Sequence, residues 1–460
     1  MPTEEPTAVV VPGALPVVGH ALHLRRRPIP FLTTLPRLGD VVRIRLGRTQ
    51  VFVPCRSELV QRVLVNDSTF DRGGGPQFER SNEFASGLAG CVHEHHRRQR
   101  RLVQPAFRTE RLASYGAVVE QELVALTDSW RDGQEFDMFP ALLDFTSGVV
   151  ARVLFSSRAE HAASGEVAHW FAVLMRQGDA GCRGLLTQVA SRLAPRTARR
   201  RHRPLIDFHQ ALDQILSDYP RPGENDGHGV GAGCGPRDMF SALALAREKG
   251  DGAGLTPQEL RSQAITMLAA GVYTPATALT WAFFLMSQYP QCAARLHAEA
   301  DTVLDGHTAR WRDLPSLTYT ERFVSETLRL YPPVWMFFRK TTADVSLGGE
   351  RIPCGATVMV SPLMLHRDED AFADPFTFDP DRWLPERITA ASRRAFTAFG
   401  GGPRRCIGDV FGLAELTLTL ATVAGQWRLE NTSRKRPPAH ACPVNLPPRH
   451  LPVRLRSRSR

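Results

Sequence analysis

Apolar residues recur at helical spacing along most of this chain of 460 residues. The segment 256–288 also carries a complete start signal, because Thr256 suits the N-cap, Pro257 the first helical position and Glu259 the third position of a capping box. The same periodicity predicts helices over 56–66, 94–106, 115–131, 138–155, 166–177, 236–248, 290–304, 319–331 and 407–424. The chain is therefore predicted to be mostly α-helical.

Extended segments are few and short. Residues 41–46 and 50–53 flank Gly47 and predict a β-hairpin, and further β-forming runs lie at 343–360 and 446–455. These runs fall between the predicted helices, which indicates small sheets within a helical protein.

Glycine and proline interrupt the pattern without dividing the chain into halves. Segments 12–31 and 373–404 are rich in turn formers and proline, and 219–236 holds too much of both residues for a regular element. We predict one domain spanning residues 1–460, with flexible segments at 1–11 and 219–236.

The formal net charge is +10, and arginine carries nearly all of the positive charge, since lysine occurs only at Lys249, Lys340 and Lys435. A solvated, arginine-rich surface explains this charge; the alternative is an electropositive docking face for an acidic protein. The basic runs lack a recognition motif or interleaved aromatic residues, which argues against nucleic-acid binding.

Cysteine spacing and apolar run lengths limit the possible sites and locations. The eight cysteines show no CxxC spacing, which argues against zinc and iron–sulfur sites, and no disulfide framework is expected. Neither the start, Met1–Val11, nor the apolar run Ala276–Met286 approaches the roughly 20 residues that span a bilayer. We expect a cytoplasmic protein without a membrane anchor.

One glycine-rich loop places a cysteine directly before a predicted helix: residues 399–408 read Phe-Gly-Gly-Gly-Pro-Arg-Arg-Cys-Ile-Gly. The free N–H groups at the start of that helix favour a thiolate at Cys406. The glycines let the backbone approach a flat partner, Gly408 leaves space beside the cysteine, and Arg404 can reach an anionic group. Taken alone, Cys406 could also be a buried structural cysteine.

This loop resembles the signature of the cytochrome P450 family, Phe-x-x-Gly-x-Arg-x-Cys-x-Gly. The fixed positions all match, and in this chain they are Phe399, Gly402, Arg404, Cys406 and Gly408. With the motifs below, the resemblance extends over about residues 12–455. It implies the cytochrome P450 fold, a triangular prism of helices and small sheets, with haem b (iron protoporphyrin IX) between a long helix and this loop and Cys406 as the ligand of the iron.

Two further segments resemble the family's buried structural network. Glu326 and Arg329 share one helical face and match its Glu-x-x-Arg motif. Phe378–Trp383 resembles a later motif in which Arg382 joins that pair, with Trp383 in place of the usual phenylalanine. The resemblance implies that the network holds the cysteine loop; a surface ion pair is the alternative for residues at this spacing.

Four residues match family positions that bind the haem propionates: His96 and Arg100 at i,i+4, then Arg339 and Arg404. Guanidinium and imidazole groups form strong charge-assisted hydrogen bonds with carboxylates. For any single arginine a solvated surface position is the alternative. The run of histidines ending at His96 is not HExxH, so no zinc site is expected.

Residues 270–274, within the predicted helix 256–288, resemble the family's oxygen-activating element. The resemblance implies that Gly271 and Thr274 open a groove in which the threonine hydroxyl and water guide protons. Tyr273 stands where the family has an acid, and its ordinary pKa of about 10 makes it a poor relay. It is therefore either a packing aromatic or a substrate or relay residue, and Pro275 is expected to bend or widen the helix.

The resemblance implies a haem-thiolate monooxygenase that uses O2 and two electrons to oxidise a hydrophobic small molecule. No flavin, nicotinamide or iron–sulfur motif remains in the chain, so we expect electrons from a ferredoxin and its NAD(P)H-dependent reductase. Surface arginines near the thiolate side are candidates for docking, with a random surface origin as the alternative: Arg98, Arg101, Arg393, Arg394 and Arg405.

The positions expected to line the substrate pocket are mostly apolar or aromatic, which suits a hydrocarbon-like ligand. They are Phe78, Phe84, Ala269, Ala270, Val272, Tyr273, Val334, Trp335, Met336, Phe337 and 444–446, including Leu446. Segments 332–335 and 96–101 resemble those of bacterial P450s from terpenoid pathways. A sesquiterpene or related terpenoid of secondary-metabolite or antibiotic biosynthesis is therefore the leading substrate class, and a macrolide or other polyketide and a fatty acid stay open.

Two other functions remain open. One is a haem enzyme that uses peroxide or catalyses a reaction other than monooxygenation; Thr274 argues against it and Tyr273 leaves it open. The other is a non-catalytic haem-binding protein, against which the intact Cys406, Thr274 and Glu326 argue.

Overall fold

The computed structural model describes residues 8–73, 86–155, 161–181, 195–217, 219, 238–248, 252–433, 445–448 and 450–458, of which 161–163, 177–181 and 195–202 by backbone alone. Helices dominate, as predicted. The α-helices are α1 (Ala21–Arg26), α2 (Pro28–Thr34), α3 (Ser57–Val65), α5 (His93–Val103), α6 (Thr109–Asp128), α7 (Met138–Phe155), α8 (His161–Gly181), α10 (Pro195–Ser217), α11 (Met239–Leu245), α12 (Pro257–Gln288), α13 (Pro290–Leu304), α14 (Thr318–Leu330), α15 (Pro362–Leu365), α16 (Ala390–Ala395) and α17 (Asp409–Gln426). The strands are β1 (Val9–Val10), β2 (Val41–Leu46), β3 (Thr49–Pro54), β4 (Phe70–Arg72), β5 (Glu135–Asp137), β6 (Phe337–Thr341), β7 (Val345–Leu347), β8 (Glu350–Ile352), β9 (Thr357–Val360), β10 (Trp427–Asn431) and β11 (Pro452–Ser457).

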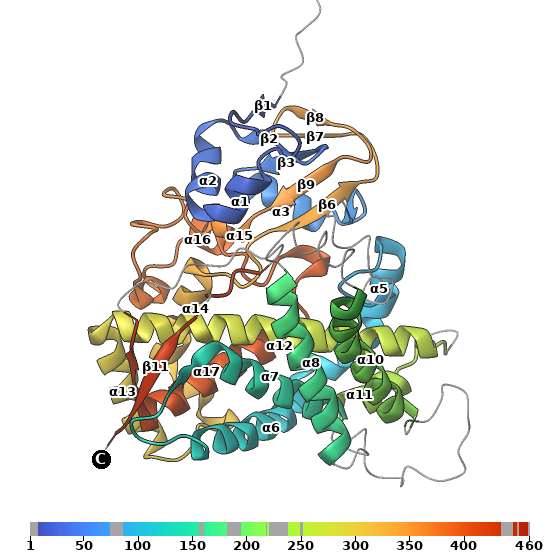
Figure 1. Cartoon of the computed structure of the whole chain (residues 1–460). Coiled ribbons are helices and arrows are strands. Elements are labelled where there is room, and N and C mark those ends of the chain that lie inside the picture. Colours follow the sequence, from blue (N-terminus) through green and yellow to red (C-terminus); the bar gives the residue numbers. More distant parts are fainter. Residues whose placement is uncertain are drawn as a thin grey trace, which may run out of the picture.

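The largest sheet gathers strands from both ends of the sequence, in the order β1-β2-β3-β9-β6-β4. Strands β2 and β3 form the predicted hairpin, and β9 joins β3 in parallel. At the far edge β4 pairs with β6, which sets Arg72 opposite Arg339. Figure 1 shows this sheet with α1, α2 and α3 as one lobe, above a helical body that α12 crosses from side to side.

The helical body contains the largest hydrophobic core, to which α7, α12 and α17 contribute most of their length. Helix α12 starts as predicted: Thr256 Oγ1 accepts from the Glu259 N–H at 3.2 Å, and Glu259 Oε2 accepts from the Thr256 N–H at 2.8 Å. It continues through Pro275 to Gln288. Of the described helices, α7 and α12 are long and apolar enough to cross a membrane, but most of each is buried inside the protein, as in core helices.

Three sequence predictions need correction. Residues 8–11 of the predicted flexible start are ordered, because β1 pairs in parallel with β2 and the Val11 N–H donates to the Arg43 carbonyl at 2.9 Å. The turn-rich segment 12–31 contains α1 and most of α2. The prolines of α2 lie in its first turn, where proline is tolerated. Helix α10 was not predicted, and it includes an internal proline, Pro204.

The predicted flexible loop 219–236 lies outside the described residues except for its first position. Tyr219 is buried, and its hydroxyl donates to Asp238 Oδ2 at 2.8 Å, next to α11. This hydrogen bond joins the two ends of the interruption.

Candidate active site

The cysteine loop is held against α3 by a contact that only glycine permits. Gly402 has a φ of +62°, and a Cβ on it would lie 2.1 Å from the Leu64 carbonyl oxygen. The Cys406 N–H donates to the Phe399 carbonyl at 2.9 Å, which closes the loop. At Gly408, by contrast, a Cβ would lie 3.5 Å from the Phe107 ring, an ordinary contact distance. Gly402 thus serves packing of the loop on α3, a role that the motif alone does not indicate.

Cys406 precedes α17 by three residues, and its side chain is accessible to solvent although protein atoms surround it on most sides. Burial raises the pKa of the Cys406 thiol and is the largest influence; the Gly408 N–H and the charges of Arg100 and Arg405 act in the opposite direction. The helix start alone therefore does not ionise this thiol. A metal ion at the sulfur would favour the thiolate.

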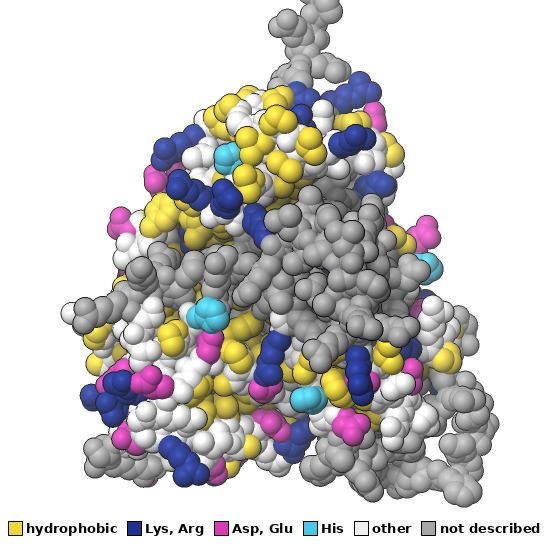
Figure 2. Space-filling model, viewed as in Figure 1, with side chains coloured by type: hydrophobic (Ala, Val, Ile, Leu, Met, Phe, Trp, Pro, Cys, Tyr) yellow, Lys and Arg dark blue, Asp and Glu magenta, His cyan; other side chains and the backbone are white. Residues whose placement is uncertain are grey.

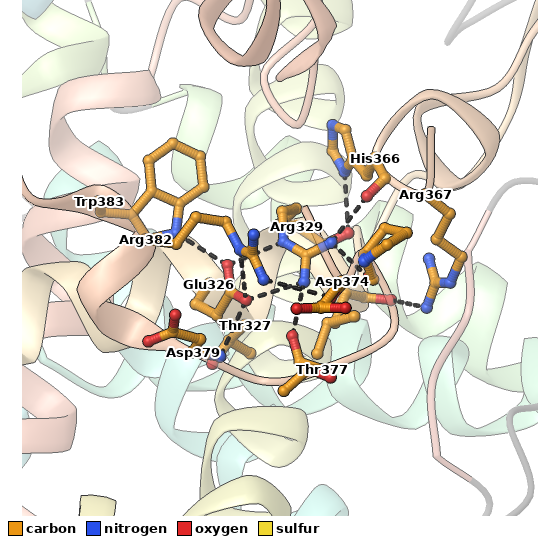
Figure 3. A network of polar contacts seen from close by, with 12 residues as sticks. Glu326, Thr327, Arg329, His366, Arg367, Asp374, Thr377, Asp379, Arg382 and Trp383 are labelled. Carbon is orange, nitrogen blue, oxygen red and sulfur yellow. Dashed lines mark hydrogen bonds and ion pairs between the residues drawn. The ribbon is translucent and has the colours of Figure 1, made fainter. Parts of the chain in front are cut away.

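The predicted structural network is present and buried (Figure 3). Arg329 binds Glu326 with two hydrogen bonds of 2.8 Å, from Nε to Oε2 and from Nη2 to Oε1. Its guanidinium also donates to the carbonyls of His366 and Pro375 at 2.7 Å and of Thr377 at 3.0 Å. One side chain of α14 thereby fixes the irregular segment that leads towards the cysteine loop.

The same carboxylate collects donors from the segment after α15. Arg382 Nε donates to Glu326 Oε1 at 3.3 Å, and the Asp379 N–H does so at 3.1 Å. Trp383 Nε1 donates to Glu326 Oε2 at 3.0 Å, a hydrogen bond that the phenylalanine usual in the family cannot make. The departure from the motif therefore adds a contact to the network.

His366, which the sequence did not single out, links this network to the cysteine loop. Its Nδ1 donates to the Arg329 carbonyl at 2.9 Å, and its Nε2 accepts from the Thr397 N–H at 2.9 Å, which sets the tautomer. Burial lowers the pKa of His366 to about 3, so the imidazole is neutral at physiological pH. Thr397 in turn accepts from the Gly400 N–H, within the loop.

A second cluster, which includes Arg404 of the cysteine loop, combines three arginines with His96. The Arg404 side chain is buried and binds Asp71 Oδ1 at 2.7 Å and, at 3.6 Å, Asp67 Oδ2. Arg339 is also buried, and its Nε has no hydrogen-bond partner among the described residues. Three guanidinium groups, including that of Arg72, thus face two carboxylates.

The pKa values of this cluster show the excess of positive charge. Burial, together with the charges of neighbouring arginines, lowers the pKa of Arg339 to about 10 and that of Arg72 to about 9. Burial, with Arg404 and Arg100, lowers the pKa of His96 to about 4, and its Nδ1 has no partner among the described residues. Such a cluster favours a buried anion, which would supply the missing negative charge and hydrogen-bond acceptors.

The structure thus brings together His96, Arg339 and Arg404, and adds Arg72, which no motif indicated. Its place depends on the pairing of β4 with β6, which a single sequence does not reveal. Arg100 lies nearby but donates to the Arg405 carbonyl at 2.7 Å, so it also braces the cysteine loop.

On α12, one face is accessible and the opposite face is buried. Ala269, Ala270, Gly271 and Thr274 are accessible to solvent. The Thr274 hydroxyl donates to the Ala270 carbonyl at 2.6 Å. Since Pro275 has no N–H, it cannot make the usual helical hydrogen bond to the Gly271 carbonyl.

Tyr273 and Val272 point away from that face. Tyr273 is buried and packs edge-on against Phe139 of α7 at 5.7 Å, an arrangement that favours the packing alternative. The Val272 carbonyl accepts from the Thr146 hydroxyl of α7 at 2.9 Å. Gly271 also serves this packing, because a Cβ on it would lie 2.9 Å from Val150 Cγ2.

Several predicted pocket residues belong to the core instead. Val272 and Leu446 are fully buried, and Trp335 and Met336 lie with Leu446 in the core beneath the large sheet. Their positions follow from packing of the sheet lobe, so they form no accessible wall. Val334 and Phe337 remain partly accessible, while Phe78, Phe84 and Val444 lie outside the described residues.

The predicted docking arginines are mostly paired. Arg98 joins α5 to the start of α12 through Glu259 Oε1 at 2.8 Å, and Arg101 binds Glu248 Oε1 at 2.5 Å. The remaining three are exposed; of these, Arg394 contacts Glu58 at 2.9 Å and Arg405 contacts Asp409 at 2.7 Å. Arg98 is thus an internal brace rather than a free surface cation.

Comparison with known proteins agrees with this geometry. The family model described as Cytochrome P450 matches residues 10–452. The chain is 42% identical over 422 residues to cyclooctatin synthase of Streptomyces melanosporofaciens, covering 91% of this chain and 89% of that protein. It is 41% identical over 457 residues to pentalenene oxygenase of Streptomyces avermitilis, covering 98% and 97%. It is 36% identical over 432 residues to cyclooctat-9-en-7-ol 5-monooxygenase of S. melanosporofaciens, covering 93% and 91%. The chain therefore belongs to the cytochrome P450 family, and it is a monooxygenase of that family.

Proposed function

We propose that this cytochrome P450 hydroxylates a cyclic terpenoid in bacterial secondary metabolism, with haem b bound through Cys406. The observation that carries the substrate class is the similarity, over nearly the whole of both chains, to a relative named for the hydrocarbon pentalenene. The other two relatives bear names of cyclooctatin chemistry, which supports a cyclic terpenoid without fixing its size.

The residues present fit haem. The excess positive charge of Arg72, Arg339 and Arg404 and the unpartnered nitrogens of His96 and Arg339 suit two propionate groups. Cys406, on the loop beside this cluster, is the only thiol in the family's signature position. The cysteine loop, which carries Cys406 and Arg404, follows the segment held by the Glu326 and His366 contacts, and these would keep the position of the ligand fixed.

When bound, haem supplies the activation of O2, to which the electron density of a thiolate ligand contributes. The protein's own part is positioning. Small residues on the accessible face of α12, Ala269 and Ala270, leave room for an apolar substrate. The Thr274 hydroxyl, now bonded to the Ala270 carbonyl, can hold a water and pass a proton on this face. Tyr273, packed on Phe139, takes no part in that transfer.

Electrons would come from a separate ferredoxin and its NAD(P)H-dependent reductase, and the protein would act in the cytoplasm. The exposed Arg393 and Arg405 lie on the side of the cysteine loop and suit an acidic redox protein. Arg98, which is mostly covered and braces α5 against α12, contributes less to such a surface.

The test is a substrate and turnover screen with purified holoenzyme. Cyclic terpene hydrocarbons, macrolactones and fatty acids are each titrated for the type I spectral change, and binders are incubated with ferredoxin, reductase and NADPH. We expect a hydroxylated terpene that depends on all three reagents. Oxidation of only macrolactones or fatty acids would refute the substrate class, and turnover with peroxide but not with ferredoxin would refute the monooxygenase cycle.

A further inference from the structure

The start of the described chain exposes an unusual amount of apolar surface. All seven residues from Pro12 to Val18 (Pro-Gly-Ala-Leu-Pro-Val-Val) are exposed, and none is polar. Val10 on β1 is 63% exposed and Val17 is 85% exposed. Single exposed apolar residues need no explanation, but a contiguous run of this kind marks a contact surface.

The loop is held in place, so its exposure is a feature of the fold. Leu15 and Gly19 exchange two backbone hydrogen bonds of 3.0 Å, and the Gly47 N–H donates to the Val18 carbonyl at 3.1 Å. Arg45 Nη2 donates to the Leu15 carbonyl at 2.8 Å. These contacts attach the loop to the β2–β3 hairpin and direct its side chains outward.

Val17 pays a conformational cost for this exposure. Its φ is +64°, a left-handed conformation that β-branched residues rarely adopt. Asparagine or aspartate fits this conformation better, and either would also be more soluble. A strained valine that points into water indicates that an apolar side chain is needed at that place.

Positive charge surrounds the apolar run. Between residues 8 and 50 the chain holds seven arginines and one acidic residue, Asp40. The exposed ones include Arg25 and Arg26 in the last turn of α1, Arg27 directly after it, and Arg48 at the tip of the hairpin. Figure 2 shows hydrophobic side chains gathered over this lobe, with Lys and Arg side chains on its margin.

We propose that this surface, Val9–Val18 with its flanking arginines, binds the interface of an anionic phospholipid bilayer. Apolar side chains enter the boundary of headgroups and acyl chains, and arginines pair with phosphates. A second copy of the chain fits poorly, since two such surfaces would bring like charges together. Binding would be peripheral and would place this lobe at a lipid phase in which terpene hydrocarbons dissolve, a role independent of the reaction at Cys406.

Sedimentation of the full-length holoenzyme with lipid vesicles tests the proposal. Vesicles of phosphatidylcholine with phosphatidylglycerol are compared with vesicles of phosphatidylcholine alone, at low and high salt. We expect binding to the anionic vesicles only, weakened by salt because exposed charges are screened. Failure of the wild type to sediment with anionic vesicles would overturn the proposal and indicate that the surface binds a protein instead.

Two variants and a matched control locate the surface. Val17→Asp should lower the bound fraction about tenfold without unfolding, because aspartate suits the local φ. The double variant Arg26→Glu, Arg48→Glu should lower it at least as much, by about tenfold or more. Val124→Asp, at a valine exposed on α6, should bind as the wild type does. Unchanged spectra of each holoenzyme check its fold, and equal vesicle binding by Val17→Asp and the wild type contradicts the proposal.

Discussion

At the scale of single residues, the site depends on a few buried polar groups, and the network around Glu326 satisfies most of its hydrogen-bonding capacity. Glu326 accepts hydrogen bonds from two arginines, one indole and one backbone N–H. A buried carboxylate is tolerated only with such partners, so loss of one donor has a measurable cost. The sequence predicted three members of this network but not the indole, since the family motif has phenylalanine there.

Replacing that indole should weaken the network. Trp383→Phe removes the hydrogen bond to Glu326 Oε2 and should lower the free energy of unfolding by about 1–2 kcal/mol. Urea denaturation followed by circular dichroism measures the change. Trp427→Phe is the matched control, because Trp427 Nε1 has no hydrogen-bond partner among the described residues. An equal or smaller loss in Trp383→Phe than in the control would argue against the role of this hydrogen bond.

Glu415 on α17 should make stability depend on pH. Burial raises the pKa of this carboxyl to about 8, and its Oε1 has no hydrogen-bond partner among the described residues. Between the unfolded pKa of about 4.3 and the folded value the native state binds the extra proton, so stability falls as pH rises. Glu415→Gln has no carboxyl to ionise, so its stability should not fall in this way. The difference in free energy of unfolding between Glu415→Gln and the wild type should therefore grow from pH 5 to pH 8, by on the order of a few kcal/mol.

Thermal unfolding of the wild type and Glu415→Gln across this pH range measures the difference. The exposed Glu369→Gln serves as the control. A constant difference between Glu415→Gln and the wild type from pH 5 to pH 8 would show that the Glu415 carboxyl does not titrate in this way.

At the scale of elements, one face of α12 is accessible to a substrate and the opposite face packs on α7. Its accessible face carries Ala270 and Thr274, and its buried face packs on α7 through Tyr273, while the partly accessible Gly271 lies against Val150 of α7. The sequence predicted this helix and its cap, but placed the buried Val272 in the substrate pocket and left Tyr273 open between packing and a role at the reaction side. Rotation of a long helix about its axis is set by its neighbours, which a single sequence does not give.

A size exchange between α7 and α12 tests this packing. In the wild type Gly271→Ala should destabilise the protein, because overpacking costs about 1–3 kcal/mol and exceeds the gain in helix propensity. In a Val150→Ala background, where the opposing methyl groups are gone, the same change should stabilise it. Chemical denaturation of the four proteins gives the coupling energy. The same effect of Gly271→Ala in both backgrounds would contradict the contact.

The accessible face makes its own prediction for Thr274. Thr274→Ala removes the hydroxyl that is bonded to the Ala270 carbonyl and that we propose to pass a proton. Because this residue does not hold haem, the variant should retain haem but release more peroxide per NADPH consumed. Thr277→Ala, at a buried hydroxyl one turn further along α12, is the control. Product and peroxide yields measure the effect, and unchanged coupling in Thr274→Ala would remove this hydroxyl from proton transfer.

At the scale of the whole molecule, the sequence predicted the class of fold, the hairpin and most long helices, because periodicity and caps are local signals. It missed α1, α2 and α10, whose prolines and charges conceal the pattern. It also missed Arg72 and His366, which reach the site through strand pairing and a long irregular segment. Contacts between distant segments, rather than local propensity, place these two residues in the site.

The central claim is that the Cys406 thiolate binds haem iron, and spectroscopy of Cys406→Ala tests it most directly. The reduced wild type under carbon monoxide should show the Soret band at the wavelength from which the family takes its name, a property of thiolate-ligated haem. Cys406→Ala should lose this band, while Cys91→Ala, at a buried cysteine whose carbonyl accepts from Arg404, should keep it. A wild type without the band, or a Cys406→Ala variant that retains it, would contradict the account.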